Sequence, residues 1–558
     1  MGQGCRFRVL TDERVRVAVV GDFLLEAGKE QSLLQAAAAG RWADLTYLPG
    51  SYWVIAQSAA RTFVCGDLSG FRSVFHAAQG PQTIWSTSAR RLARHVGAGP
   101  DLAMMAARLV AGAEHWPERT VYQNVRAVPP GFGLLLDGRG SRLVDVREIT
   151  PAATLAQGAP AFAQALETAV RWRVRQAGGL VGADVSGGLD SSTLAILAAQ
   201  DGEVRAVTYA DGYTSAEDLF FARRVAAHIG TDLAVGTGGD EQLPFGWTLT
   251  QPLADQPAAV SLTTAQHALY LRPAAGLPLH FTGNGGDVVL DSCSAAWIGM
   301  VQLGERKEAR RRVTNWARAR NRSPRRLWSA VTEAAGSGHA NALRAAARRT
   351  ARGDFDARRP GVWSWCHLGQ AGSWLTAQGR ERVCALLLEA AGTTTAEARA
   401  DLAEQYFSLR LVGADARDTL PLTAAWKIRP VHPFLDNEVV RATFAIAPPE
   451  RHGVTSFKPL LPAALPYLPA WLTARTSKGS FTRQLTAGMV HHRARLAELI
   501  RSSALTAGGL LDAEPALAAL AGVDGTQAAC LYDLQRLVTA CQWLEAAEHR
   551  VLNLEAAC

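Results

Sequence analysis

Two different patterns of apolar and polar residues divide the chain. In the first part, apolar runs are short, partly alternating and interrupted by Gly, Pro and Asp, as in 15-VRVAVVGDFLLE-26 and 131-GFGLLLDG-138. This pattern is typical of β-strands joined by turns. It predicts a sheet-based N-terminal domain over residues 1–150, followed by a linker at 150-TPAATLAQGAPA-161.

After the linker, short apolar segments alternate with helical patterns. The apolar segments predicted as strands are 180-LVGADVS-186, 204-VRAVTYA-210, 233-LAVG-236 and 278-PLHFT-282. Alternating strands and helices predict a parallel, doubly wound sheet. From about residue 295 the pattern is mostly helical. The chain is therefore expected to be an α/β protein whose second domain, residues 160–558, combines a parallel sheet with helical additions.

Composition narrows the functional classes. With 558 residues, the chain is long enough for two or more cores. Its 8 cysteines are scattered without a CxxC pair, so neither a zinc site nor structural disulfides are expected. No apolar run reaches the roughly 18 residues of a membrane span, and MGQGCRFRVLTDERVRV lacks the apolar core of a signal peptide. We expect a cytoplasmic protein with no membrane partner. The net charge of +8 is partly concentrated in one stretch, and no motif supports nucleic-acid binding.

The segment 180-LVGADVSGGLDSSTLAILAAQ-200 holds the strongest chemical signal. A turn between a parallel strand and a helix lies at the carboxyl edge of the sheet, where ligands bind in open α/β folds. Glycines there allow close approach of the backbone, and hydroxyls and helix N–H groups form a nest for pyrophosphate. No GK[ST] follows, which excludes a P-loop, and simple helix capping would need only one such residue. The predicted cradle consists of Ser186, Gly187, Gly188, Leu189, Asp190, Ser191 and Ser192.

SGGLDSS resembles the pyrophosphate loop of the ATP pyrophosphatases, and the wider chain resembles the asparagine synthetase superfamily. Members of that superfamily use ATP to adenylate a carboxylate, and an amine then displaces AMP. The segment 282-TGNGGDVV-289 is similar to the second glycine-rich loop of these enzymes, which adds Gly283, Gly285 and Gly286 to the expected ATP site. By this resemblance Asp190 and Asp287 hold Mg²⁺, a hard cation that prefers oxygen ligands.

Two further segments follow in family order. The first, 429-RPVHPFLDNEVV-440, resembles the family's PFLD segment, and the second, 475-RTSKGSF-481, resembles its RxxKxxF segment. The resemblance makes Lys478 the catalytic lysine, which would stabilise charge that develops at the α-phosphate. Lys458 in FKPLLPAAL matches the family's KxxL segment and is expected to contact ATP, although Pro462 stands where an Arg is usual.

The N-terminal domain is similar to the glutaminase domain of the same superfamily, an αββα fold of the Ntn-hydrolase type. The similarity rests on 64-VCGDLSGFRSVFHA-77, 85-WSTSARRLAR-94 and 121-VYQNVRAVPPGFGLLLDG-138. Glutamine-dependent members carry their nucleophilic Cys directly after the initiator Met, whereas Gly2 stands there and the nearest cysteine is Cys5. Arg429 also replaces the Glu that precedes PFLD in asparagine synthetases. We therefore expect a degenerate domain without glutaminase activity.

Members that lack the terminal Cys use an amine of their own substrate. These are the β-lactam synthetases and the lasso peptide cyclases, which close a macrolactam between an Asp or Glu side chain and the N-terminal amine of a precursor peptide. GNGGD, the altered PFLD segment and the basic stretch 305–326 favour a lasso cyclase, which works with a leader peptidase and a recognition protein. A β-lactam synthetase, another small-molecule amidotransferase and a non-catalytic scaffold are the alternatives. Trp363, Trp365 and Trp374 are candidates for the substrate wall, with core packing as the commoner role of clustered tryptophans.

Overall fold

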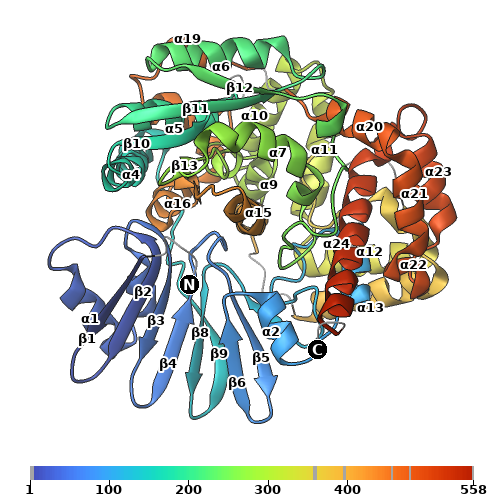
Figure 1. The fold of residues 1–558 in the computed structure, drawn as a ribbon, viewed down its shortest axis with the longest axis horizontal. Helices are drawn as coiled ribbons and strands as arrows, with labels where there is room; N and C mark the ends of the chain where they lie inside the picture. The colour runs from blue at the N-terminus through green and yellow to red at the C-terminus, as the bar shows by residue number, and fades with distance from the viewer. Residues whose placement is uncertain (1–5, 356–360, 394–397, 454–456, 477–478, 556–558) are drawn as a thin grey trace.

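The computed structural model describes residues 6–355, 361–393, 398–453, 457–476 and 479–555. In Figure 1 an antiparallel sheet region from the N-terminal part lies below a parallel sheet, and helices from the C-terminal part lie beside both. The β-rich N-terminal region and the parallel sheet predicted from the sequence are thus both present.

Two antiparallel sheets form the N-terminal region. The larger has the strand order β1-β2-β3-β4-β8-β9, and the smaller has the order β6-β5-β7. The sheets face each other through Val64, Val74, Val128 and Leu134, which form one buried cluster. Helix α1 packs against the outer side of the larger sheet, and α2 and α3 pack against the smaller one. The bounds are β1 Arg6–Thr11, β2 Arg16–Phe23, α1 Lys29–Ala39, β3 Gly50–Gln57, β4 Arg61–Cys65, β5 Val74–Gln79, β6 Gln82–Ser86, α2 Ala89–His95, α3 Leu102–Ala111, β7 Arg126–Val128, β8 Phe132–Asp137 and β9 Gly140–Asp145.

The second sheet is parallel throughout, with the order β12-β11-β10-β13-β14. The chain runs outward from β10 to β12 and then returns to the other side of β10. Ligands bind at this kind of reversal in open α/β folds, so the loops after β10 and β13 occupy the expected binding edge. The elements are β10 Leu180–Asp184, α5 Leu189–Ala199, β11 Glu203–Ala210, α6 Ala216–His228, β12 Leu233–Thr237, α7 Thr264–Leu271, β13 His280–Phe281 and β14 Pro430–Val431.

The segment expected as a linker is helical over much of its length. Helix α4 spans Leu155–Gln176, so it begins inside the stretch 150–161. A capping box explains the early start, because the Thr154 hydroxyl accepts from the Gln157 N–H and the Gln157 side chain reaches back to the Thr154 backbone. Composition alone hides this start, because the Ala, Gly and Pro around it are typical of linkers.

Helices make up most of the remaining chain, as predicted. They are α8 Gly286–Val289, α9 Ala295–Gln302, α10 Arg306–Ala319, α11 Pro324–Ala335, α12 His339–Arg352, α13 Ala377–Thr393, α14 Ala400–Asp418, α15 Leu420–Ala425, α16 Asn437–Phe444, α17 Pro448–Arg451, α18 Leu460–Ala464, α19 Ala470–Thr473, α20 Thr482–His491, α21 Arg493–Ser502, α22 Ala504–Ala507, α23 Ala513–Ala521 and α24 Leu531–Glu555. Among the described residues, none of the helices is long and apolar enough to cross a membrane.

Two side-chain groups singled out in the sequence have plain structural roles. Trp365 and Trp374 are buried in hydrophobic clusters, and the half-buried Trp363 packs edge-on against Trp365 with ring centroids 5.0 Å apart. In the basic stretch, α10 buries Ala309, Val313 and Ala317 and leaves most of its arginines exposed. Core packing therefore accounts for Trp365 and Trp374, and an amphipathic surface helix accounts for the arginines of α10.

The two halves of the chain share a hydrophobic core. Side chains of β2 and β3 pack in one cluster with Leu409 and Ala416 of α14 and with Val440 and Phe444 of α16. Polar contacts reinforce this junction, since Asp22 on β2 forms ion pairs with Arg72 and with Arg429. Arg429 therefore joins the segment leading into β14 to the N-terminal sheet.

Candidate active site

The loop after β10 contains a glycine at a position where a side chain would not fit. Gly187 has a φ of +78°, in the left-handed region that favours glycine, and a Cβ at this position would collide with the carbonyl oxygen of Asp218. Gly188 is the N-cap of α5 and supplies no side-chain hydrogen bond to the helix. Simple helix capping therefore does not explain this loop, and no side-chain cap competes for the first N–H groups of α5.

The residues of the predicted cradle differ in exposure. Ser186 is exposed and Ser191 is 6% exposed, and their hydroxyl oxygens lie 2.9 Å apart; the Gly188 N–H donates to Ser186 Oγ at 3.3 Å. Leu189 and Ser192 are also buried, with exposed fractions of 4% and 0%. The Ser192 hydroxyl has no hydrogen-bond partner among the described residues. These two residues can therefore contribute to a ligand only through their backbone.

The second glycine-rich loop packs directly on the first. A Cβ on Gly283 would lie 2.8 Å from the Ser191 nitrogen and 3.0 Å from the Asp190 Cβ. A Cβ on Gly286 would collide with the Asp190 carboxyl group, and Gly285 has a φ of +96°. Glycine is thus required here because the two backbones approach too closely for side chains.

Lys458 brings the two predicted metal carboxylates together. Its side chain is only 1% exposed, and its ammonium group donates to Asp190 and, at 2.7 Å, to Asp287. Its backbone has a φ of +53°, unusual for a residue with a side chain, and its N–H donates to Asp291 Oδ2 at 3.2 Å. Residues 190, 287 and 458 are far apart in the sequence but meet at the reversal point of the parallel sheet.

This arrangement suits a hard cation that also contacts phosphate. In the described ranges, no group of three or more His, Cys, Asp or Glu side chains is arranged to hold a metal ion. Two carboxylates that already converge on one positive charge can nevertheless hold Mg²⁺ when phosphate oxygens and water complete its six ligands. The donor set at Asp190 and Asp287 therefore fits Mg²⁺ bound together with a nucleotide.

The segment that contains Lys478 is anchored beside the first loop. Lys478 itself lies outside the described residues, but Arg475 donates to the Gly187 carbonyl oxygen at 2.5 Å and forms an ion pair with Asp218. A Cβ on Gly479 would collide with the Asp218 carboxylate. Arg475 and Gly479, which flank Lys478 in the sequence, thus both lie against Asp218. Arg475 also contacts the SGG loop, Ser186–Gly187–Gly188.

The family follows from comparison with known proteins. The model of a family described as asparagine synthase matches residues 161–545. The chain belongs to the asparagine synthase family. Membership implies an ATP-dependent enzyme that forms a carbon–nitrogen bond. A search of curated proteins found no match.

Two solved structures give weaker similarities. An allosteric regulatory enzyme of purine biosynthesis is 13% identical, with a TM-score of 0.18, over 36% of this chain and 46% of its own. A glutamine phosphoribosylpyrophosphate amidotransferase from B. subtilis, complexed with ADP and GMP, is 9% identical, with a TM-score of 0.18, over 50% of this chain and 64% of its own. This asparagine synthase family member thus spans less than two thirds of either protein, and scores this low carry no conclusion about function.

In this asparagine synthase family member, residues in and next to the PFLD segment form buried polar contacts, one of them with the second glycine-rich loop. Asp436 accepts two hydrogen bonds from the Arg173 guanidinium, at 2.5 and 2.7 Å, and both side chains are buried. His432 shares a 2.6 Å hydrogen bond with the Thr282 hydroxyl at the start of the second loop. Burial, with the nearby Arg72 and Arg173, lowers the pKa of His432 to about 3, so it is neutral at physiological pH.

Sequence reasoning assigned no role to two residues that shape this site. Arg475 is the first residue of the RxxKxxF segment, so its position three residues before Lys478 was an available signal. Asp218 lies on α6 without any motif around it, and its partner Arg475 is 257 residues away. Contacts over such separations leave no local pattern in a sequence.

Proposed function

We propose that the protein is an AMP-forming macrolactam synthetase that acts within one precursor peptide, as lasso peptide cyclases do. An Asp or Glu side-chain carboxylate of the peptide attacks the α-phosphorus of ATP, and the bond to the β-phosphate breaks and releases pyrophosphate. The N-terminal amine of the same peptide then attacks the acyl carbon. The bond to AMP breaks, the nitrogen loses a proton to solvent, and the amide ring is closed.

The observation that carries this proposal is the convergence of two glycine loops, two aspartates and one buried lysine at the reversal point of the parallel sheet. The SGG loop offers backbone N–H groups to the departing pyrophosphate. Asp190 and Asp287 are the residues that would hold Mg²⁺, which neutralises charge on phosphate oxygens. Lys458 adds a fixed positive charge at the same place. Preorganised charge of this kind favours the transition state more than the bound substrate.

Lys478 keeps its predicted catalytic role in this proposal. Its neighbours Arg475 and Gly479 lie against Asp218, and Arg475 contacts the SGG loop, where the α-phosphate of ATP would be close by. An ammonium group there would stabilise the oxyanion that forms when the amine attacks the activated carboxyl group.

The N-terminal region acts in our proposal as a degenerate glutaminase-type domain of the Ntn αββα kind. Its antiparallel sheets face each other between outer helices, which is compatible with that fold. Cys65, on β4, is buried, and burial raises the pKa of its thiol to about 12. A nucleophilic cysteine needs a lowered thiol pKa, so Cys65 is unsuited to attack glutamine. Cys5 lies outside the described residues. In our proposal the substrate itself supplies the amine.

The proposed partners follow from the lasso cyclase assignment. They are a precursor peptide as the substrate, together with a leader peptidase that frees the N-terminal amine and a recognition protein that delivers the peptide. We propose that these reactions take place in the cytoplasm and involve neither nucleic acid nor a membrane. Mg²⁺ and ATP are the expected cofactor and cosubstrate.

The test is incubation of the full chain with ATP, Mg²⁺ and a leader-free precursor peptide, followed by mass spectrometry and nucleotide analysis. We expect AMP, pyrophosphate and a peptide lighter by one water. Asp190→Asn should abolish AMP formation, whereas Asp201→Asn, a change at an acidic residue outside both loops, should not. ADP in place of AMP would contradict the mechanism, and absence of nucleotide turnover would favour a scaffold. AMP formed with a small amino acid derivative but with no peptide would favour a β-lactam synthetase.

A further inference from the structure

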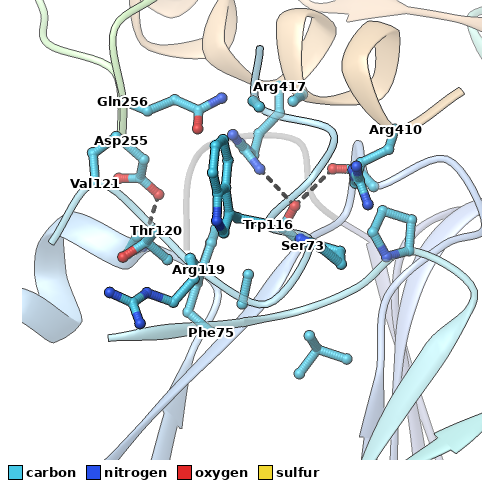
Figure 2. Close-up of a pocket in the computed structure, with 18 of the residues that line it drawn as sticks. Ser73, Phe75, Trp116, Arg119, Thr120, Val121, Asp255, Gln256, Arg410 and Arg417 are labelled. Atoms are coloured by element: carbon cyan, nitrogen blue, oxygen red, sulfur yellow. Dashed lines mark hydrogen bonds between the residues drawn. The ribbon is translucent and has the colours of Figure 1, made fainter. Parts of the chain in front are cut away.

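A cavity away from the ATP loops lies between the N-terminal region and helix α14 (Figure 2). Its walls come from the β4–β5 loop, β5, the first residue of α2, the end of α3 and the segment that follows it, β7, residues 255–256 and α14. The space open to the centre of a water molecule is about 80 Å³, several times the roughly 10–15 Å³ that one water requires. The cavity therefore has room for a small organic molecule, and none of its lining residues belongs to the candidate ATP site.

Four arginines line this cavity, and two of them form no ion pair among the described residues. Arg119 forms ion pairs with two carboxylates on the outer side, and Arg417 pairs with the buried Asp418. For Arg108 and Arg410, in contrast, no ion pair occurs in the described part of the chain. Arg108 donates only to the oxygens of Gln256 and Arg119, and its buried Nε has no hydrogen-bond partner there.

The one acidic side chain in the cavity wall is already occupied. The Asp255 carboxylate accepts from the Ser88 hydroxyl at 2.8 Å and from the Ala89 N–H at 2.9 Å, so it caps the start of α2. Asp255 forms no ion pair with Arg108 or Arg410 in the described part of the chain. Both arginines are half-buried. A partly desolvated guanidinium without an ion-pair partner gains from a bound anion.

Burial is the main influence on the pKa values of both arginines. Burial lowers the pKa of Arg108 to about 10; the charges of Arg410 and Arg417 act in the same direction, and those of Asp418 and Asp101 oppose them. Burial likewise lowers the pKa of Arg410 to about 10, against the opposing charge of Glu114. Both groups remain protonated at neutral pH, so the cavity keeps its positive charge.

The rest of the cavity wall is largely apolar. This favours an anion that carries an apolar group over an inorganic anion. Figure 2 shows the Trp116 ring standing in the cavity near Arg417 and Gln256. Other apolar wall residues are Phe75, Pro117, Val121, Pro130 and Leu411. A phosphate would need polar donors on several sides. A carboxylate on a small apolar body would place its two oxygens on the guanidinium forks and its body against the indole ring.

We propose that this cavity, which Trp116 also lines, is a binding site for a small organic carboxylate held by Arg108 and Arg410. The carboxylate comes either from a free acid or from an acidic residue or C-terminus of a bound peptide. Because the cavity is formed by both halves of the chain, its ligand bridges the N-terminal sheets and α14. The proposal does not depend on the ligase activity, since binding is measured without ATP.

The experiment uses the full-length protein, with benzoate as the probe and benzamide as its uncharged match, by calorimetry at constant ionic strength. We expect one benzoate site per chain and at least tenfold weaker binding of benzamide. Inorganic phosphate should also bind at least tenfold more weakly than benzoate. Three results with the wild-type protein alone would overturn the proposal. They are equal binding of benzoate and benzamide, no binding of either compound, and tighter binding of phosphate than of benzoate.

Variants then locate the site. Arg108→Gln and Arg410→Gln should each weaken benzoate binding at least tenfold. Ala414→Leu fills the cavity from α14 but keeps every arginine, and it should weaken binding to the same extent. Arg175→Gln, at an arginine outside the cavity, is the control and should leave binding unchanged. Wild-type affinity in Ala414→Leu would show general attraction to positive charge and refute the site. Short peptides that end in a free acid or an amide distinguish the two sources, because only a peptide-derived ligand makes the acid peptide bind more tightly than benzoate.

Discussion

Replacing Lys458 with Met tests whether its ammonium group holds the two loops together. The change keeps the apolar stem but removes a charge that is 1% exposed and contacts both Asp190 and Asp287. Breaking a fully buried ion pair costs about 3–5 kcal/mol. The Asp287 side chain is 61% exposed and the Asp190 side chain 14%, so water compensates part of that loss. We expect the free energy of unfolding to fall by about 2–3 kcal/mol.

Mg²⁺ should reverse much of this loss, because a cation bound to both carboxylates takes the place of the ammonium group. At a concentration of 100 times its Kd, a ligand stabilises the folded state by about 2.7 kcal/mol. Urea unfolding with and without MgCl₂, at equal ionic strength, measures the effect, and the exposed Lys307→Met is the matched control. If Lys458→Met is as stable as wild type without Mg²⁺, and both respond equally to it, Lys458 is not the internal counter-ion of this site.

Three more outcomes follow from the same contacts. Gly187→Ala should weaken ATP binding, measured by calorimetry, at least tenfold, because the φ of +78° at Gly187 and the close backbone of α6 exclude a side chain. The φ of Gly188 is ordinary, so the control Gly188→Ala should bind ATP nearly as tightly as the wild type. Arg173→Met leaves the Asp436 charge buried and should cost about 3–5 kcal/mol in urea unfolding, whereas wild-type stability would show that this pair contributes nothing. His432 has a folded pKa of about 3, below its ordinary 6.5, so its neutral form favours folding. Its contribution to stability is complete above about pH 6.5 and is lost as pH falls, by up to about 1.4 kcal/mol per pH unit. If the Tm of His432→Asn falls as much as the Tm of the wild type when the pH is lowered, His432 is not the cause of the acid sensitivity.

Strand and helix alternation predicted the parallel sheet because its longer strands are apolar runs bounded by turns. β10 and β11 are clear in the sequence for that reason. β14 is only two residues long and contains Pro430, so its pairing with β13 becomes visible only when both strands are in place. The start of α4 was also missed, because a capping box of two polar residues was hidden in a stretch with the composition of a linker.

The sequence predicted only those residues of the candidate site that belong to recognisable motifs. The resemblance named Asp190, Asp287 and Lys458, and the structure places all three in contact. It did not indicate that Lys458 would bridge the two carboxylates. Lys458 is 268 positions from Asp190 and 171 positions from Asp287, so only the folded chain brings them together. The role of Lys478 stays a prediction.

The shared core beneath β2 and β3 has a consequence for protein engineering. Leu409, Val440 and Phe444 come from the catalytic half but are covered by the N-terminal strands. A truncated chain that begins at residue 160 would expose this apolar surface to water and should aggregate. Exchanging the first 150 residues with those of a relative would therefore require matching substitutions on α14 and α16. The two halves can be told apart by sequence, but their shared core means that a change in one must be matched in the other.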